Sequence, residues 1–148
     1  MPKFAILKEG VNEALISETK GKVEKYIQEL FHDYEIVKID DYYTFTFGTI
    51  SVTIEVLPWH SEDVLVKVYS YLAENIEIAG ARAEALLNLN SRISFGSFGI
   101  TFEKQAVFVY SLAGKNLDLN EFQAAVQMVA KTADEFDEII KKGEAIPV

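Results

Sequence analysis

The chain has 148 residues, of which 49% are hydrophobic and 12% aromatic, and its formal net charge at neutral pH is −9. This length fits one folded domain with a sizeable core, and the apolar fraction excludes a disordered chain. The negative charge disfavours nucleic acid and anionic membranes as partners because both would repel it, whereas a basic segment of a partner protein would be attracted.

The sequence contains no cysteine, which excludes disulfides, thiolate catalysis and cysteine-ligated metal sites. The apolar run at residues 4–7 is too short for a signal peptide. No window approaches the roughly 18 apolar residues that a membrane-spanning helix needs. We therefore expect a cytoplasmic protein that carries no metal or other cofactor.

Residues 1–16 are expected to form an N-terminal arm, in which residues 4–7 are a short strand or an apolar arm and residues 11–16 are helix-compatible. A helix over 18–34 follows from apolar residues spaced three and four apart. These residues are Val23, Ile27, Leu30, Phe31 and Tyr34.

Alternation of apolar and polar residues then predicts strands over 42–47, 50–56 and 64–71. Their short links, a tight turn at 48–49 and a loop at 58–63, indicate an antiparallel meander. Residues 35–39 either add a short strand or lengthen the first one.

A second helix is predicted over 79–90, followed by a turn in which Gly96 and Gly99 supply unusual backbone angles. Strands over 98–103 and 107–112 come next. A glycine loop that cradles phosphate follows a strand and opens a helix. Here the helix precedes the glycines, so the pattern favours a structural turn.

The last helix is predicted over 119–142, with Asp118 as N-cap and Glu121 completing a capping box. Leu117 and Phe122 occupy the positions of a hydrophobic staple around that cap. A tail follows at 143–148. The expected fold is therefore one α+β domain over 17–142, with the order α-β-β-β-α-β-β-α and helices packed on an antiparallel sheet.

Candidate catalytic residues are few. His60, Ser61 and Asp63 name the members of a hydrolase triad, but proximity in sequence provides neither a constrained nucleophile nor an oxyanion hole. The acidic run at 134–138 lacks the loop glycine of an EF-hand. We therefore expect a protein that is not an enzyme and has no metal site.

Strands 64–71 and 107–112 carry apolar residues on both faces, unlike strand 50–56. One explanation is that the three helices cover both sides of the sheet. The other is that one face packs against a second subunit or a partner peptide.

Four segments carry a family resemblance: residues 86–91 (LLNLNS), 95–100 (FGSFGI), 107–112 and 116–122 (NLDLNEF). With the order of elements, the size and the acidity, they resemble the type III secretion chaperone-like fold and, within it, the bacterial YbjN-like family. The resemblance covers about residues 17–142. It implies a small, acidic, non-catalytic and often homodimeric protein that binds extended apolar segments of a protein or peptide partner.

The resemblance also implies two sets of site residues. The dimer interface would comprise Ala83, Leu86, Leu87, Leu89, Phe98 and Ile100. The partner-binding surface would comprise Phe31, Tyr34, Tyr69, Tyr71, Phe108 and Tyr110. The alternative functions are a dimeric regulatory or scaffold domain that binds a folded partner, and an enzyme or small-molecule sensor that uses residues 59–63.

Overall fold

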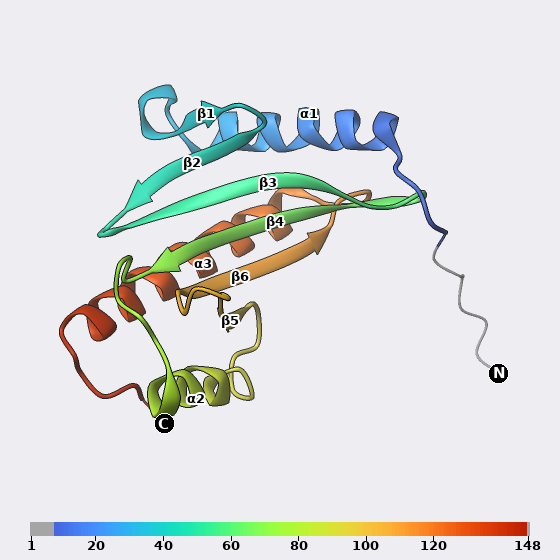
Figure 1. Ribbon diagram of the computed structural model, residues 1–148. Helices are drawn as coiled ribbons and strands as arrows, with labels where there is room; N and C mark the ends of the chain where they lie inside the picture. Colours follow the sequence, from blue (N-terminus) through green and yellow to red (C-terminus); the bar gives the residue numbers. More distant parts are fainter. Residues whose placement is uncertain (1–7, 148) are drawn as a thin grey trace.

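A computed structural model of the chain describes residues 8–147 and shows an α+β fold built on one six-stranded antiparallel sheet. The helices are α1 (Glu13–Leu30), α2 (Gly80–Leu89) and α3 (Leu119–Lys141), with a 3-10 turn at Asp33–Glu35. The strands are β1 (Val37–Ile39), β2 (Tyr42–Phe47), β3 (Ile50–His60), β4 (Asp63–Leu72), β5 (Ser97–Ile100) and β6 (Ala106–Ala113). Their order across the sheet is β1-β2-β3-β4-β6-β5 (Figure 1).

Helix α3 forms as the sequence predicts, and it covers the middle of the sheet. Asp118 Oδ1 accepts the Glu121 N–H at 2.7 Å, and Glu121 returns a hydrogen bond to the Asp118 N–H at 3.1 Å. Both staple residues, Leu117 and Phe122, are buried. The apolar stripe of α3 packs against β3, β4 and β6, and its buried members are Phe122, Val126, Val129, Ala133, Phe136 and Ile140.

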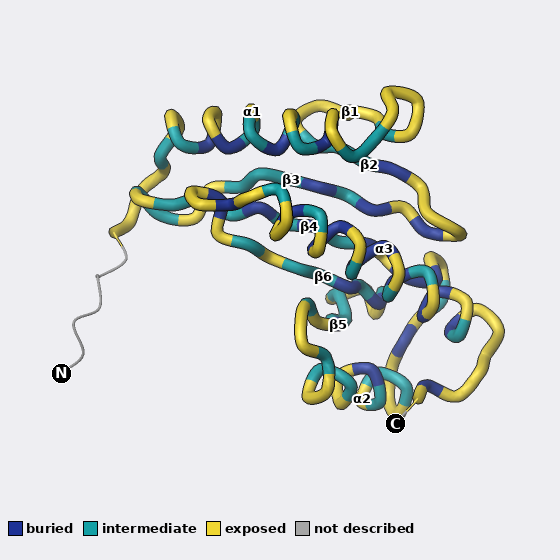
Figure 2. Tube along the Cα trace, turned by 180° about the vertical axis from the view of Figure 1, so that it is seen from behind, coloured by how far each residue is buried: buried dark blue, intermediate teal, exposed yellow. Residues whose placement is uncertain are grey.

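Helices α1 and α3 pack on the same face of the sheet. Val66 and Val68 of β4 are fully buried on that face, and Ile54 of β3 lies opposite Val68 in the register. The alternate residues Lys67 and Tyr69 point to the other face and are only half-buried. In Figure 2, buried segments (dark blue) and half-buried segments (teal) follow one another along β3 and β4. Helix α2 lies beyond β5. Of the two explanations for strands that are apolar on both faces, coverage of both faces by the helices is therefore wrong for the described residues.

The predicted range of the first helix is wrong at both ends. Asn12 caps α1, its Oδ1 accepting the Leu15 N–H at 2.9 Å, so the helix begins inside the expected N-terminal arm. At the other end Phe31 is extended, with φ −128° and ψ 146°, and Tyr34 lies in the 3-10 turn. Residues 4–7, the possible strand, lie outside the described residues.

Other differences concern strand ends and one glycine. Strand β3 continues through Trp59 to His60, where a loop was expected, and β1 is a separate short strand. Gly96 has φ +77°, and a Cβ there would lie 2.7 Å from Phe108 Cζ, which confirms the need for glycine. Gly99 has no positive φ and lies within β5, so the prediction of an unusual backbone angle there is wrong.

A buried carboxylate connects three parts of the fold. Asp137 of α3 has a side chain that is 2% exposed and pairs with Lys141 at 2.9 Å. It accepts the N–H of Ala73 at the end of β4, at 2.6 Å, and the hydroxyl of Thr49 in the β2–β3 turn. Burial alone would raise the pKa of Asp137, but the hydrogen bonds from Thr49, Lys141 and Ala73 lower it on balance.

The same turn leaves no room for a side chain at Gly48. Its φ is +57°, and a Cβ there would collide with the carboxylate of Asp134. Oδ1 of that carboxylate accepts the Thr49 N–H at 3.0 Å. Asp134 and Asp137 therefore hold the β2–β3 turn against α3 at a fixed distance.

We predict that Asp137→Asn lowers the free energy of unfolding at pH 7 by about 1.5–3 kcal/mol, because hydrogen bonds to a charged acceptor are replaced by weaker ones. The folded-state pKa of Asp137 lies below the unfolded value of about 3.9. Its contribution is therefore complete above that value and is lost as the pH falls through the folded-state pKa. Urea denaturation across pH 2–7 should show a flatter acid limb for the variant.

Glu138→Gln is the matched control, since Glu138 is the next residue of α3 and its side chain is 52% exposed. Equal losses in the two variants at pH 7 would contradict the role given to Asp137.

Candidate functional site

The structure does not bring the six predicted partner-binding residues together. Tyr69 and Tyr71 lie on the sheet face that carries no helix, with ring centroids 5.8 Å apart. Phe31 lies at the end of α1 on the opposite face. Tyr34, which is 86% exposed, stacks on His32.

The remaining two lie on the helix-covered face of β6. Phe108 is fully buried and packs edge-on against Phe98 at 4.9 Å, so it belongs to the core and presents no surface to a partner. Tyr110 is half-buried and stacks on Phe95 at 5.9 Å. Alternation in β6 thus separates Phe108 and Tyr110 from Tyr69 and Tyr71.

An apolar groove of about 270 Å³ lies between the end of α1, strand β2 and helix α3. We call it the α1–α3 groove. It is lined by Leu30, Phe31, Phe45, Phe47, Gln123, Val126, Gln127, Ala130 and Lys131. Of the predicted partner-binding residues, only Phe31 lines it.

Aromatic packing and the β2–β3 turn fix the shape of this groove. Phe31 packs against Phe45 with ring centroids 4.7 Å apart, which closes the α1 end. Phe47, at the other end, is 42% exposed and adjoins the turn whose Thr49 bonds to Asp134 of α3. The groove therefore runs from Leu30 to Phe47 along α3.

The outer edge of β2 is open beside the groove. Strand β1 pairs with β2 only at residues 42–44, so residues 45–47 have no strand neighbour on that side within the described part of the chain. Unpaired strand edges are sites where an extended segment can add to a sheet.

The opposite edge of the sheet, β5, is covered at Phe98 by one side chain. Asn90, just after α2, accepts the N–H of Phe98 at 2.7 Å and donates to the carbonyl of Phe98 at 3.0 Å. Its amide thus occupies both outward-facing backbone groups of Phe98 on β5, as a neighbouring strand would.

The predicted dimer residues differ in exposure. Leu86 and Phe98 are buried within the protomer, whereas Ala83, Leu89 and Ile100 are half-buried and Leu87 is 49% exposed. Leu87 and Leu89 line a hollow of about 380 Å³ beside α2, together with Pro147. The accessible apolar surface of α2 therefore centres on Leu87.

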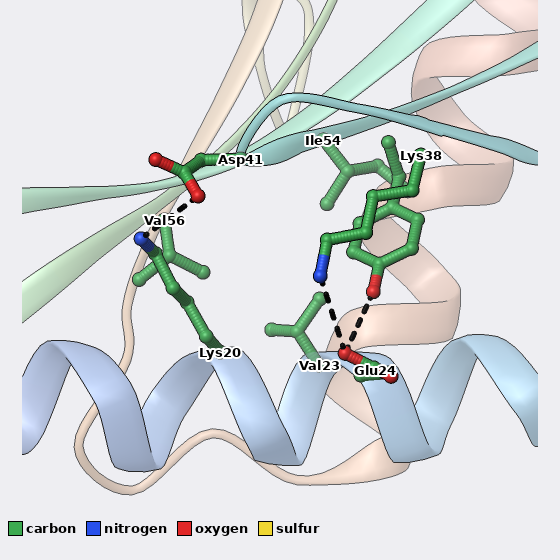
Figure 3. A pocket seen from close by; sticks show the side chains of 8 residues that line it. Lys20, Val23, Glu24, Lys38, Asp41, Ile54 and Val56 are labelled. Atoms are coloured by element: carbon green, nitrogen blue, oxygen red, sulfur yellow. Dashed lines mark hydrogen bonds and ion pairs between the residues drawn. The ribbon is translucent and has the colours of Figure 1, made fainter.

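A second hollow, between α1 and the sheet, is too small for a ligand. Its volume is about 30 Å³, room for about one water molecule. Figure 3 shows Lys20 facing Asp41 on one side and Glu24 facing Lys38 on the other. The Lys20 Nζ–Asp41 Oδ1 and Lys38 Nζ–Glu24 Oε2 distances are both 3.8 Å, and the Tyr43 hydroxyl donates to Glu24 at 2.8 Å. Burial and the hydrogen bond to Glu24 raise the pKa of Tyr43 to about 12. The contacts of Glu24 with Lys38 and Tyr43 link α1 to β1 and β2.

The helix-free sheet face has a mixed polar and aromatic surface. Thr44, Thr53, Tyr69 and Val109 form one row across four strands. Tyr69 donates a hydrogen bond to Glu55, and burial together with this bond raises the pKa of Tyr69. The polar partners make this face less suited than the α1–α3 groove to an apolar segment.

The triad-like residues have structural partners. His60 Nδ1 accepts the Glu62 N–H at 3.2 Å, and Asp63 accepts the N–H groups of Val64 and Lys115. Among residues 8–147, no three His, Asp or Glu side chains gather as metal ligands. No helix in the same range is long and apolar enough to cross a membrane.

A family model described as "T3SS (YopN, CesT) and YbjN peptide-binding chaperone 1" matches residues 18–143. The chain belongs to this family. No match was found among curated proteins. The family and the α+β fold class predicted from the sequence are both confirmed. Because the family is described as peptide-binding chaperones, the surfaces of interest are those that fit an extended peptide.

The sequence-based prediction missed most of the groove. Phe45 and Phe47 stand out in the sequence as an aromatic strand face, which is the one signal that could have found them. Val126 and Ala130 read as core residues of α3, and they are indeed 6% and 4% exposed. Their place beside β2 follows from packing and not from periodicity.

We predict that Asn90→Ala lowers the free energy of unfolding by about 1–3 kcal/mol, because both outward backbone groups of Phe98 lose their partner. Urea denaturation measures the loss, and hydrogen exchange at the Phe98 amide should accelerate. Asn88→Ala, an exposed position on α2, is the control. Unchanged exchange at Phe98 in Asn90→Ala would contradict this role.

Proposed function

We propose that this chain is a non-catalytic chaperone module that binds an extended, apolar segment of a partner protein in the α1–α3 groove. The observation that carries the proposal is the position of the groove beside the unpaired edge of β2. An extended peptide placed there gains backbone hydrogen bonds from residues 45–47 and buries alternate side chains in the groove.

The composition of the groove supports this occupant. Its β2 and α1 sides are entirely apolar, supplied by Leu30, Phe31, Phe45 and Phe47. Burial of apolar surface contributes about 25 cal/mol per Å², so a few aliphatic side chains of a partner suffice for a transient complex. The groove residues include no pair of carboxylates and no nucleophile with a base, which supports binding over catalysis.

The alternative of a regulatory domain that binds a folded partner is favoured by a different surface. Tyr69 and Tyr71 form an aromatic pair on the helix-free face, where a flat partner surface fits better than a single strand. Tyr69→Ala/Tyr71→Ala therefore distinguishes the two functions, since it leaves the α1–α3 groove intact.

We further propose that the chain forms a homodimer through α2. Within the described residues α2 packs chiefly against β5, and it carries the exposed Leu87 next to the half-buried Leu89. A helix that is apolar beyond its own packing surface is a common contact between subunits.

We predict that Phe47→Ser weakens peptide binding about tenfold, because a large apolar contact at the open end of the groove is lost. Fluorescence anisotropy would use a labelled, end-capped peptide of eight residues in which valine and threonine alternate. Phe102→Ser is the control, since Phe102 is fully exposed and lies outside the groove.

Equal affinity in Phe47→Ser and the unchanged protein would contradict binding in the α1–α3 groove. Loss of binding in Tyr69→Ala/Tyr71→Ala alone would favour the helix-free face instead.

We predict that Leu87→Glu halves the mass measured by light scattering, because a buried charge at the subunit contact is costly. Val37→Glu replaces another exposed apolar residue, on β1 at the far edge of the sheet, and should leave the mass unchanged. A monomeric mass for the unchanged protein at high concentration would contradict the homodimer.

A further inference from the structure

The α3 wall of the α1–α3 groove carries polar side chains beside the apolar Val126 and Ala130, unlike the wall formed by α1 and β2. Gln123, Gln127 and Lys131 line it, each four residues after the previous one, so all three project from one side of the helix. Val126 and Ala130 lie between them and are buried. The three polar ends therefore form a line along the groove.

The spacing of this line matches an extended chain. Four helical residues rise about 6 Å, and two residues of a strand span about 6.6 Å. Backbone groups of an extended peptide that face the same side recur at this two-residue interval. The amides of Gln123 and Gln127, each with donors and an acceptor, can therefore bond successive backbone groups of one bound strand.

Lys131 is the only charged residue that lines the groove, and it lies at the end nearest the β2–β3 turn. It takes part in none of the ion pairs found among residues 8–147. Asp134, one turn further along α3, already accepts the N–H and the hydroxyl of Thr49. An ammonium group thus stands beside the apolar groove in a chain whose net charge is −9.

We propose that the α1–α3 groove selects an extended apolar segment that carries an acidic side chain at its Phe47 end, where Lys131 binds the carboxylate. Gln123 and Gln127 hold the backbone of the segment whatever its sequence, and Lys131 supplies the sequence preference. This inference rests on the proposed function, because it specifies the ligand of the same groove.

The selectivity runs against the overall charge of the protein. At long range, the negative chain repels an acidic peptide and attracts a basic one. Within the groove, an ion pair at the rim contributes only modestly, since exposed pairs are screened by solvent and salt. The preference is therefore local, about two- to fivefold in affinity, and should diminish as the salt concentration rises.

The test uses end-capped, fluorescein-labelled peptides of eight alternating valine and threonine residues, extended by Glu, Gln or Lys at one end or the other. Because the direction of the bound strand is open, both ends are compared. We expect one Glu peptide to bind about two- to fivefold more tightly than its Gln counterpart. Lys131→Glu should reverse the order in favour of the Lys peptide.

Lys142→Glu is the matched control, because Lys142 has the same charge and follows α3 outside the groove. It should leave the order of the peptides unchanged. Gln123→Ala/Gln127→Ala should weaken all peptides by a similar factor and preserve the preference for Glu.

Two results would overturn the inference in distinguishable ways. If the Glu and Gln peptides bind equally well and Phe47→Ser still weakens binding, the preference for an acidic side chain is contradicted but the proposed function is not. Failure of every peptide to bind the unchanged protein would remove the proposed function and this inference together.

Discussion

The packing of both long helices on one face of the sheet determines which surfaces are available for binding. Val66 and Val68 are buried beneath the helices, whereas Tyr69, the neighbour of Val68, remains at the surface of the other face. Because α1 ends at Leu30 and α3 continues to Lys141, the two helices leave a gap over β2. That gap is the α1–α3 groove, and Asp137 fixes its far end by linking α3 to the β2–β3 turn.

Local rules were sufficient to predict most of the elements. The capping box at Asp118 and Glu121 fixed the start of α3, and strict alternation located β2 and most of β3. The errors arose where a tertiary contact decided the outcome. Asn12, whose side-chain amide also donates to the carbonyl of Ser61 at 2.9 Å, caps α1 earlier than expected, and pairing with β4 extends β3 through Pro58.

The candidate site was harder to predict because it combines three elements that are distant in the sequence. Periodicity shows that Phe108 and Tyr110 share a face of β6, but it does not tell which face receives the helices. The partner-binding residues implied by the resemblance include Phe108, which the structure buries. The polar wall of the groove gave no signal, since Gln127 and Lys131 resemble any exposed side of a helix.

The side chain of Asn90 has a consequence for assembly. If both edges of the sheet could accept a strand, the β2 edge of one molecule could pair with the β5 edge of the next, and this head-to-tail contact would repeat without limit. The amide of Asn90 occupies the outward N–H and carbonyl of Phe98 on β5. This residue therefore has no free backbone groups to pair with the β2 edge of a neighbouring molecule. Head-to-tail growth of the sheet from one molecule to the next is thereby opposed at β5.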